Sequence, residues 1–176
     1  MAAYISLLRG INVSGQKKIK MDELKKLYDS LGFKKVQTYI QSGNVVFECP
    51  DASIPKIAER IGKKIKESFG FDVAVLIRTK EEFKKIIRNN PFSKKENNSL
   101  YVIFLSDTAS DLPMAELNNA KSKSEEFFIS GREIYLSCPG GYGKTKLSNN
   151  FFERKLKLSA TTRNWKTVNK LMEIAG

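Results

Sequence analysis

The first eighty residues contain six predicted elements in the order strand, helix, strand, strand, helix, strand. Apolar residues at helical spacing indicate the two helices, which end at Gly32 and Gly70. Short apolar or alternating runs indicate the strands, the first of which is AYISLL at 3–8. This order is that of the ferredoxin-like split unit, in which helices pack on an antiparallel sheet. It constrains the fold more than any other feature of the chain.

A connecting segment follows this first module. Residues 81–99 are predicted to form a helix and a polar linker, and Thr79 and Glu82 are spaced as a capping box at the start of that helix. The segment therefore separates two predicted modules, 1–80 and 100–176.

The second module repeats the theme of the first. It reads as strand, helix, strand, strand, helix, and it ends in a further helix. The hairpins SGNVVFECP (42–50) and SGREIYLSCP (130–139) share Ser-Gly at the turn and Cys-Pro at the exit. Chance resemblance of two hairpins is the alternative to duplication, and the shared order of elements favours duplication. The sequence therefore predicts an α+β protein of two ferredoxin-like βαββα(β) modules in tandem, with mostly antiparallel sheets packed with helices.

The chain is strongly basic, with 31 lysines and arginines, 19 acidic residues and a net charge of +12. Residues 140–170 contain eight basic residues and one acid, Glu153. Such a region favours anionic partners, and we expect nucleic acid or a phosphate-bearing small molecule. A lysine-rich surface that only keeps the protein in solution is the alternative.

The composition excludes several classes of function. The absence of histidine excludes Ser-His-Asp and Cys-His nucleophile systems, and two cysteines are too few for an all-cysteine zinc site. No apolar run approaches the roughly 20 residues of a membrane span, and the N-terminus does not read as a signal peptide. We therefore expect a cytoplasmic protein with no metal, no cofactor and no membrane partner. An enzyme is not favoured, because no catalytic motif is recognised, and the oligomeric state stays open.

The stretch CPGGYGKTKLS at 138–148 ends in a Gly-Lys-Thr that resembles a nucleotide phosphate loop. The P-loop pattern requires a glycine five residues before this tripeptide, where the chain has Cys138. The strand most similar to a Walker-B strand ends at Asp107 and precedes the loop, whereas it should follow it. We therefore reject a P-loop NTPase.

A weaker hypothesis survives for the same stretch. Its glycines let backbone N–H groups converge at a helix N-terminus, where an anion is favoured. The alternative is a strand-to-helix turn that needs glycine only for a positive φ angle. The candidate anion-binding residues here are Gly141, Gly143, Lys144, Thr145 and Lys146.

Two further candidates lie in the first module. In the loop RGINVSGQKKIK, Arg9 and Asn12 could hold a planar or anionic group, or Arg9 could pair with a carboxylate. In the hairpin QSGNVVF, Ser42 and Asn44 are most simply turn residues. The sequence does not favour an RNA-recognition module here, because the third strand of such a module carries aromatic residues where this chain has Asn44 and Val46.

The last candidate is TTRNWKT at 161–167, which we interpret as the start of the final helix. Thr162 or Asn164 would cap that helix, and Trp165 would lie in the core. Arg163 has no evident structural role, so it is a candidate ligand group or a member of a buried ion pair.

Several segments in combination resemble a known family. They are LLRGINVSG, TYIQSGNVVF, NPF, CPGGYGKTKLS and TTRNWKTVNKL. Together they resemble the bacterial domain of unknown function 1697 (DUF1697) family, from Ile5 to about Leu171. The resemblance implies a two-part α+β fold and supplies no catalytic residues, since the family has no established activity. It marks as motif positions Arg9, Asn12, Ser42, Asn44, Lys146, Arg163 and Asn164.

The leading functional hypothesis is binding of an anionic, phosphate-bearing ligand or nucleic acid. Its charged contacts would be Arg9, Lys144, Lys146 and Arg163. An enzyme acting on a small polar substrate and a protein–protein interaction module are the alternatives. The sequence identifies neither the ligand nor a reaction.

Overall fold

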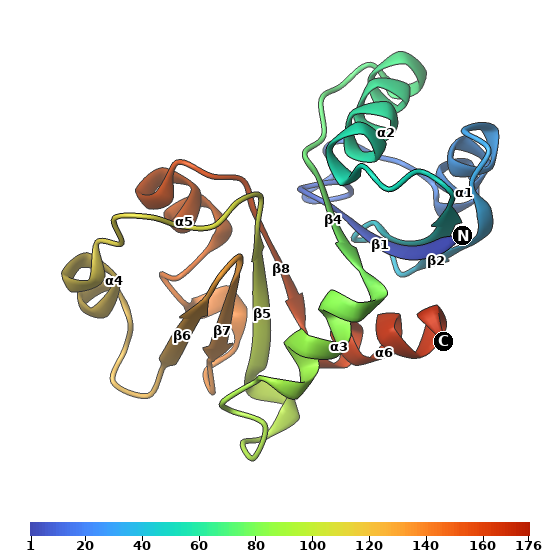
Figure 1. Ribbon diagram of the computed structural model, residues 1–176. Helices are drawn as coiled ribbons and strands as arrows, with labels where there is room; N and C mark the ends of the chain where they lie inside the picture. The colour runs from blue at the N-terminus through green and yellow to red at the C-terminus, as the bar shows by residue number, and fades with distance from the viewer. The chain divides into compact units, whose positions relative to one another are not determined.

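The computed structural model describes all 176 residues, which divide into two compact units (Figure 1). The first unit consists of Met1–Lys85 and Lys170–Gly176, and the second consists of Ile86–Asn169. The boundaries fall within two helices, α3 (Lys80–Arg88) and α6 (Trp165–Ala175). Each unit is described by itself below.

The first unit contains a four-stranded antiparallel sheet in the order β2-β3-β1-β4. This order, with the first strand at the centre, is the one that the ferredoxin-like prediction requires. Its elements are β1 (Ala2–Leu8), α1 (Met21–Ser30), β2 (Lys34–Tyr39), β3 (Asn44–Cys49), α2 (Ile54–Phe69) and β4 (Val75–Thr79).

The second unit contains a sheet with the equivalent order, β6-β7-β5-β8, which is also antiparallel throughout. Two antiparallel sheets packed with helices confirm the predicted α+β fold. The elements of this unit are β5 (Leu100–Leu105), α4 (Met114–Ala120), β6 (Glu126–Ser130), β7 (Glu133–Ser137), α5 (Asn149–Leu156) and β8 (Ala160–Asn164), with short 3₁₀ turns at Asn97–Ser99 and Tyr142–Lys144.

Strand β8 corrects the prediction for the second module, which was expected to read βαββα before its last helix. Residues 160–164 pair with β5 in antiparallel register, from Ala160 opposite Leu105 to Asn164 opposite Tyr101. The strand was missed because it lacks apolar alternation and runs directly into α6. The β-branched pair Thr161-Thr162 was the available signal, since such residues favour strands. Both modules therefore have the complete βαββαβ order.

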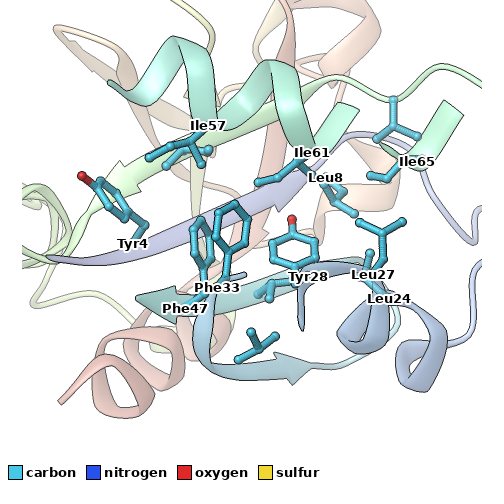
Figure 2. Packing of buried hydrophobic residues seen from close by; sticks show 14 of the residues in the cluster. Tyr4, Leu8, Leu24, Leu27, Tyr28, Phe33, Phe47, Ile57, Ile61 and Ile65 are labelled. Atoms are coloured by element: carbon cyan, nitrogen blue, oxygen red, sulfur yellow. The ribbon is translucent and has the colours of Figure 1, made fainter. Parts of the chain in front are cut away.

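The core of the first unit lies between its sheet and the two helices, α1 and α2 (Figure 2). Phe33 and Phe47 stack with ring centroids 4.6 Å apart, and the rings of Tyr28 and Phe47 meet edge to face with centroids 5.4 Å apart. The phenol of Tyr28 is fully buried, and its oxygen hydrogen bonds to Oγ of Ser6 at 2.7 Å. Because the two hydroxyl groups hydrogen bond to each other, neither is left as an unpaired polar group in the core.

The core of the second unit has the same plan. Its sheet contributes Ile103 and Ile134, and its helices contribute Leu117 of α4 and Phe152 of α5; all four side chains are fully buried. Cys138, at the exit of the second hairpin, belongs to this cluster.

The hairpin turn at Gly43 packs closely against the loop that follows β1. Gly43 has φ +85°, and a Cβ atom there would lie 2.6 Å from Cδ1 of Ile11 and 2.9 Å from Cβ of Leu8. The side chain of Asn12 fastens the same loop, because its Nδ2 donates to the carbonyl oxygens of Gln41 at 2.8 Å and Ile19 at 3.0 Å. The motifs RGIN and SGN therefore form one structural contact.

Gly43→Ala should destabilise the protein more than Gly32→Ala. Both glycines have positive φ, so each variant pays about 1–2 kcal/mol for the left-handed backbone. Only Gly43 is crowded, since a Cβ at Gly32 meets no atom within 4 Å. Overpacking should add about 1–3 kcal/mol at Gly43. Urea unfolding measures both variants, and equal losses of stability would contradict this account.

Candidate functional site

A hollow of about 320 Å³ lies in the second unit between the end of α4 and the segment 138–147, called the glycine loop below. Three lysines and one carboxylate line it, and none of the three lysines forms an ion pair. Other lysines of this unit do form one, such as Lys155 with Glu116 at 2.6 Å. The hollow is lined by Asn119, Ala120, Lys121, Ser122, Ser124, Glu125, Gly140, Gly141, Lys144 and Lys146.

The glycine loop does not lead directly into a helix N-terminus, which corrects the sequence-based expectation. Its glycines are followed by the 3₁₀ turn Tyr142–Lys144 and then by residues 145–148 before α5 begins. The first turn of α5 is capped by Ser148, whose Oγ accepts from the N–H of Phe151 at 3.2 Å. An anion at the loop would therefore contact loop backbone and lysine side chains, without the N-terminus of α5.

Backbone conformation and packing explain only some of the glycines in the loop. Gly141 has φ +90°, a conformation that favours glycine. Gly140 and Gly143 have no such φ, and a Cβ at either would meet no atom within 4 Å. The turn alone therefore explains Gly141, whereas neither backbone conformation nor crowding explains the other two.

Glu125 lies at the hollow, and the residue is only 6% exposed. Its Oε1 accepts from the N–H of Ser122 at 2.9 Å, and its Oε2 accepts from Sγ of Cys138 at 3.1 Å. Burial acts to raise the pKa of Glu125, but hydrogen bonds from Ser122, Cys138 and the Thr145 side chain outweigh it and hold the pKa below its usual value. Glu125 is therefore ionised at neutral pH.

The thiol of Cys138 serves as a hydrogen-bond donor in this arrangement. Burial, together with the neighbouring Glu125 carboxylate, raises the pKa of Cys138 to about 11. Because the thiolate is the nucleophilic form, a thiol held protonated is poorly reactive. Cys138 therefore supports the loop and is not a nucleophile.

Tyr142 fastens the glycine loop to α5 and β8. Its hydroxyl oxygen accepts from the N–H of Asn149 at 3.0 Å and lies 3.1 Å from Oγ1 of Thr162. Oγ1 of Thr162 in turn donates to Oδ1 of Asn149 at 2.6 Å. The loop is therefore held on the helix-covered face of the sheet.

Arg163 lies on the opposite face of that sheet, because neighbouring side chains on a strand alternate and Thr162 faces the loop. It is buried, and its Nη1 donates to Oγ1 of Thr161 at 2.7 Å and to the carbonyl of Thr162 at 3.0 Å. Within the second unit, Arg163 and Lys146 are therefore not brought together. Asn164 caps α6 as predicted, since its Oδ1 accepts from the N–H of Thr167 at 2.8 Å.

The candidate residues of the first unit are largely engaged in its own turns. Asn44 is fully buried, and its Nδ2 donates to the carbonyl of Tyr39 at 2.8 Å and to Oγ of Ser42 at 2.9 Å. Arg9 follows β1 and donates its backbone N–H to Ala74 at 3.0 Å. The side-chain amide of Asn12 hydrogen bonds only to backbone atoms: its nitrogen donates to two carbonyl oxygens, and its oxygen accepts from one N–H group. That these residues bind a ligand stays a prediction.

A larger hollow of about 720 Å³ lies beside the loop that contains Asn12. It mixes charges, because Lys18 and Lys20 share it with Asp22 and Glu23. Its residues are therefore less suited to an anion than those of the hollow at the glycine loop.

Comparison with known proteins places the chain in a family. A family model described as "Protein of unknown function (DUF1697)" matches residues 1–135. The chain belongs to the DUF1697 family. A solved structure, that of conserved bacterial protein SP0830 from Streptococcus pneumoniae, is similar at 26% identity with a TM-score of 0.76, over 99% of each chain. A comparison with curated proteins finds no match. Membership confirms the resemblance seen in the sequence motifs and assigns no activity.

This DUF1697 protein has an arginine equivalent to Arg163 that sequence reasoning missed. Arg78 is buried at the end of β4, and its Nη1 donates to the carbonyl of Ile77 at 3.1 Å. The next residue, Thr79, begins α3 in the predicted capping box, since its Oγ1 accepts from the N–H of Glu82 at 3.1 Å. In both modules the last strand thus ends in arginine and then a capping residue. The repeated pair, Arg-Thr and Arg-Asn, was the available signal.

Two classes of feature are not found in the structure. No group of three or more Cys, Asp or Glu side chains is placed to hold a metal ion. None of the helices combines the length and the apolar character needed to cross a bilayer.

Cys138 should react very slowly with iodoacetamide in the folded DUF1697 protein. A thiol with a pKa of about 11 carries only about 0.1% thiolate at pH 8, and burial hinders access. Labelling followed by peptide mass spectrometry separates Cys138 from Cys49. The same reaction in concentrated urea is the control and should be fast. Rapid labelling of Cys138 in the folded protein at pH 8 would contradict the assigned role.

Proposed function

We propose that this DUF1697 member is a bacterial, cytoplasmic protein that binds a phosphate-bearing anion in the hollow beside the glycine loop. The observation that carries the proposal is the gathering of Lys121, Lys144 and Lys146 around one hollow, with no ion pair to any of them. Two free, buried thiols support the cytoplasmic location, and the similarity to a conserved bacterial protein supports the bacterial origin.

The residues of the hollow suit phosphate chemistry. Lysine ammonium groups bind phosphate as compact point charges with three donors each. The exposed residues Ser122 and Ser124 supply hydroxyl groups at the same hollow. Gly140 presents backbone without a side chain, which allows a ligand to approach closely. The one carboxylate, Glu125, is buried and already accepts hydrogen bonds from protein donors.

The size of the hollow limits what it can enclose. Its volume of about 320 Å³ lies at the small end of ligand pockets, which span about 300–1,000 Å³. One phosphate group with its attached sugar is therefore the part of a ligand that would lie inside. The same phosphate chemistry is found in a free nucleotide and in a nucleic acid backbone, so binding experiments must compare the two.

Lys144→Ala/Lys146→Ala should weaken binding of a phosphate-bearing ligand by about tenfold or more, because each lysine supplies a charge-assisted contact. Titration at low salt with inorganic phosphate, a nucleoside monophosphate, single-stranded RNA and single-stranded DNA measures the effect. If an oligonucleotide binds, the log–log dependence of its affinity on salt should become shallower by about 2 in the variant.

The matched control is Lys56→Ala/Lys63→Ala, which removes the same charge from exposed positions on α2 in the first unit. This control should bind as the wild type does. Equal losses in both double variants would mean that only net charge matters. Absence of binding by the wild-type protein to all four probes would contradict the proposed function.

Gly140→Ala should leave stability unchanged or slightly higher, and should weaken binding. No atom lies within 4 Å of the added Cβ, and the backbone there is not left-handed. Loss of glycine freedom in the unfolded chain should stabilise by about 0.4–1 kcal/mol. Thermal unfolding and a titration with the tightest of the four probes measure the two effects. Unchanged affinity in this variant would show that no ligand approaches the loop backbone at Gly140.

A further inference from the structure

The carboxylate of Glu125 contacts both ends of the glycine loop. At the start of the loop, Sγ of Cys138 donates to Oε2 at 3.1 Å. Toward its end, the side chain of Thr145 hydrogen bonds to the same carboxylate. Oγ1 of Thr145 already accepts from the N–H of Leu147 at 3.1 Å, so its proton is available to the Glu125 carboxylate and to the neighbouring sulfur of Cys138. Residues distant along the loop are therefore joined through one side chain.

Between these ends, few other hydrogen bonds hold the part of the loop that contains Lys144 and Lys146. Its internal backbone hydrogen bonds are the N–H of Gly141 to the carbonyl of Cys138 at 2.9 Å, and the N–H groups of Lys144 and Thr145 to preceding carbonyls at 3.3 Å. The thiol of Cys138 is also within reach of the carbonyl of Gly141, at 3.3 Å, so Glu125 shares this donor with the loop. Tyr142 fastens its middle to α5 and β8. Lys144 lies between Tyr142 and Thr145, and Lys146 directly follows Thr145. Their positions at the hollow thus depend on both anchors.

We propose that Glu125 is the positioning residue of the anion site, and that its carboxylate joins Cys138 to Thr145 and so places Lys144 and Lys146 at the hollow. This inference rests on the proposed function. The carboxylate acts through the loop and not by touching the ligand, because Glu125 as a residue is only 6% exposed and its oxygens already accept from Ser122, Cys138 and Thr145.

The chemistry of the contact explains why an acid stands beside an anion site. The groups that hydrogen bond to the carboxylate are all donors: the N–H of Ser122, the S–H of Cys138, and the O–H groups of Thr145 and Ser122. A neutral amide in its place would present N–H groups toward some of these donors and leave them without an acceptor.

Glu125→Gln tests this role with two readouts. Hydrogen exchange, measured without any ligand, should become about tenfold faster or more at the amides of Gly141 and Thr145, because a bond to a charged acceptor is lost at each end of the loop. Equilibrium dialysis with inorganic phosphate should show an affinity about tenfold lower than that of the wild type. Unchanged exchange in this variant would overturn the inference.

Cys138 provides a conservative pair for the same test. Cys138→Ser keeps a donor for Glu125 and should retain exchange rates and phosphate affinity within about twofold of wild type, whereas Cys138→Ala removes the donor and should reproduce the Glu125→Gln effects. The two variants differ by one hydroxyl group, so the comparison still decides the question if Glu125→Gln does not fold. Equal behaviour of the two would overturn the inference.

Ser148→Ala is the control for a general loss of stability. It removes the cap of α5 in the same unit without touching the hollow, so it should lower the melting temperature and leave phosphate affinity unchanged. If the wild-type protein bound no phosphate, the proposed function and the positioning role would both be overturned, whichever way the exchange rates moved. If it bound phosphate and Glu125→Gln bound it equally well, only the positioning role would be overturned.

Discussion

The first strand of each unit pairs on both sides, and this constraint organises the rest of the structure. β1 lies between β3 and β4, and β5 lies between β7 and β8. A central strand is hydrogen bonded along both edges. Consecutive residues of both strands are buried on both faces, from Tyr4 to Leu8 and from Val102 to Leu105. Polar chemistry is thereby confined to the loops at the strand ends, which is where the family motifs occur.

Those loops have different roles in the two units. After β1, the amide of Asn12 and the close contact of Gly43 with Ile11 use the motif residues to join a loop to a hairpin. After β7, the glycine loop has two glycines that neither packing nor backbone conformation requires, and it borders a hollow with three unpaired lysines. Similar hairpins thus lead to a structural contact in one module and to a candidate anion site in the other. Duplication of the fold does not imply duplication of the site.

The sequence was sufficient for the order of elements, because helical spacing and strand alternation are local properties of a chain. It was insufficient for β8, whose residues are polar and whose end is also the cap of a helix. Because that strand was not recognised, the sequence could not show on which face of the sheet Arg163 lies. Glu125 was not among the predicted site residues, since only tertiary folding places its carboxylate against Cys138. Residues that act through sequence-distant contacts carry no local pattern.

The central claim is that an anion binds at the glycine loop and not at the basic surface in general. A titration of ¹⁵N-labelled protein with inorganic phosphate at low salt, followed by amide chemical shifts, tests it directly. The account predicts saturable shifts confined to residues 119–125 and 140–146. Shifts spread over lysine-rich segments of both units, or no shifts at all, would contradict it.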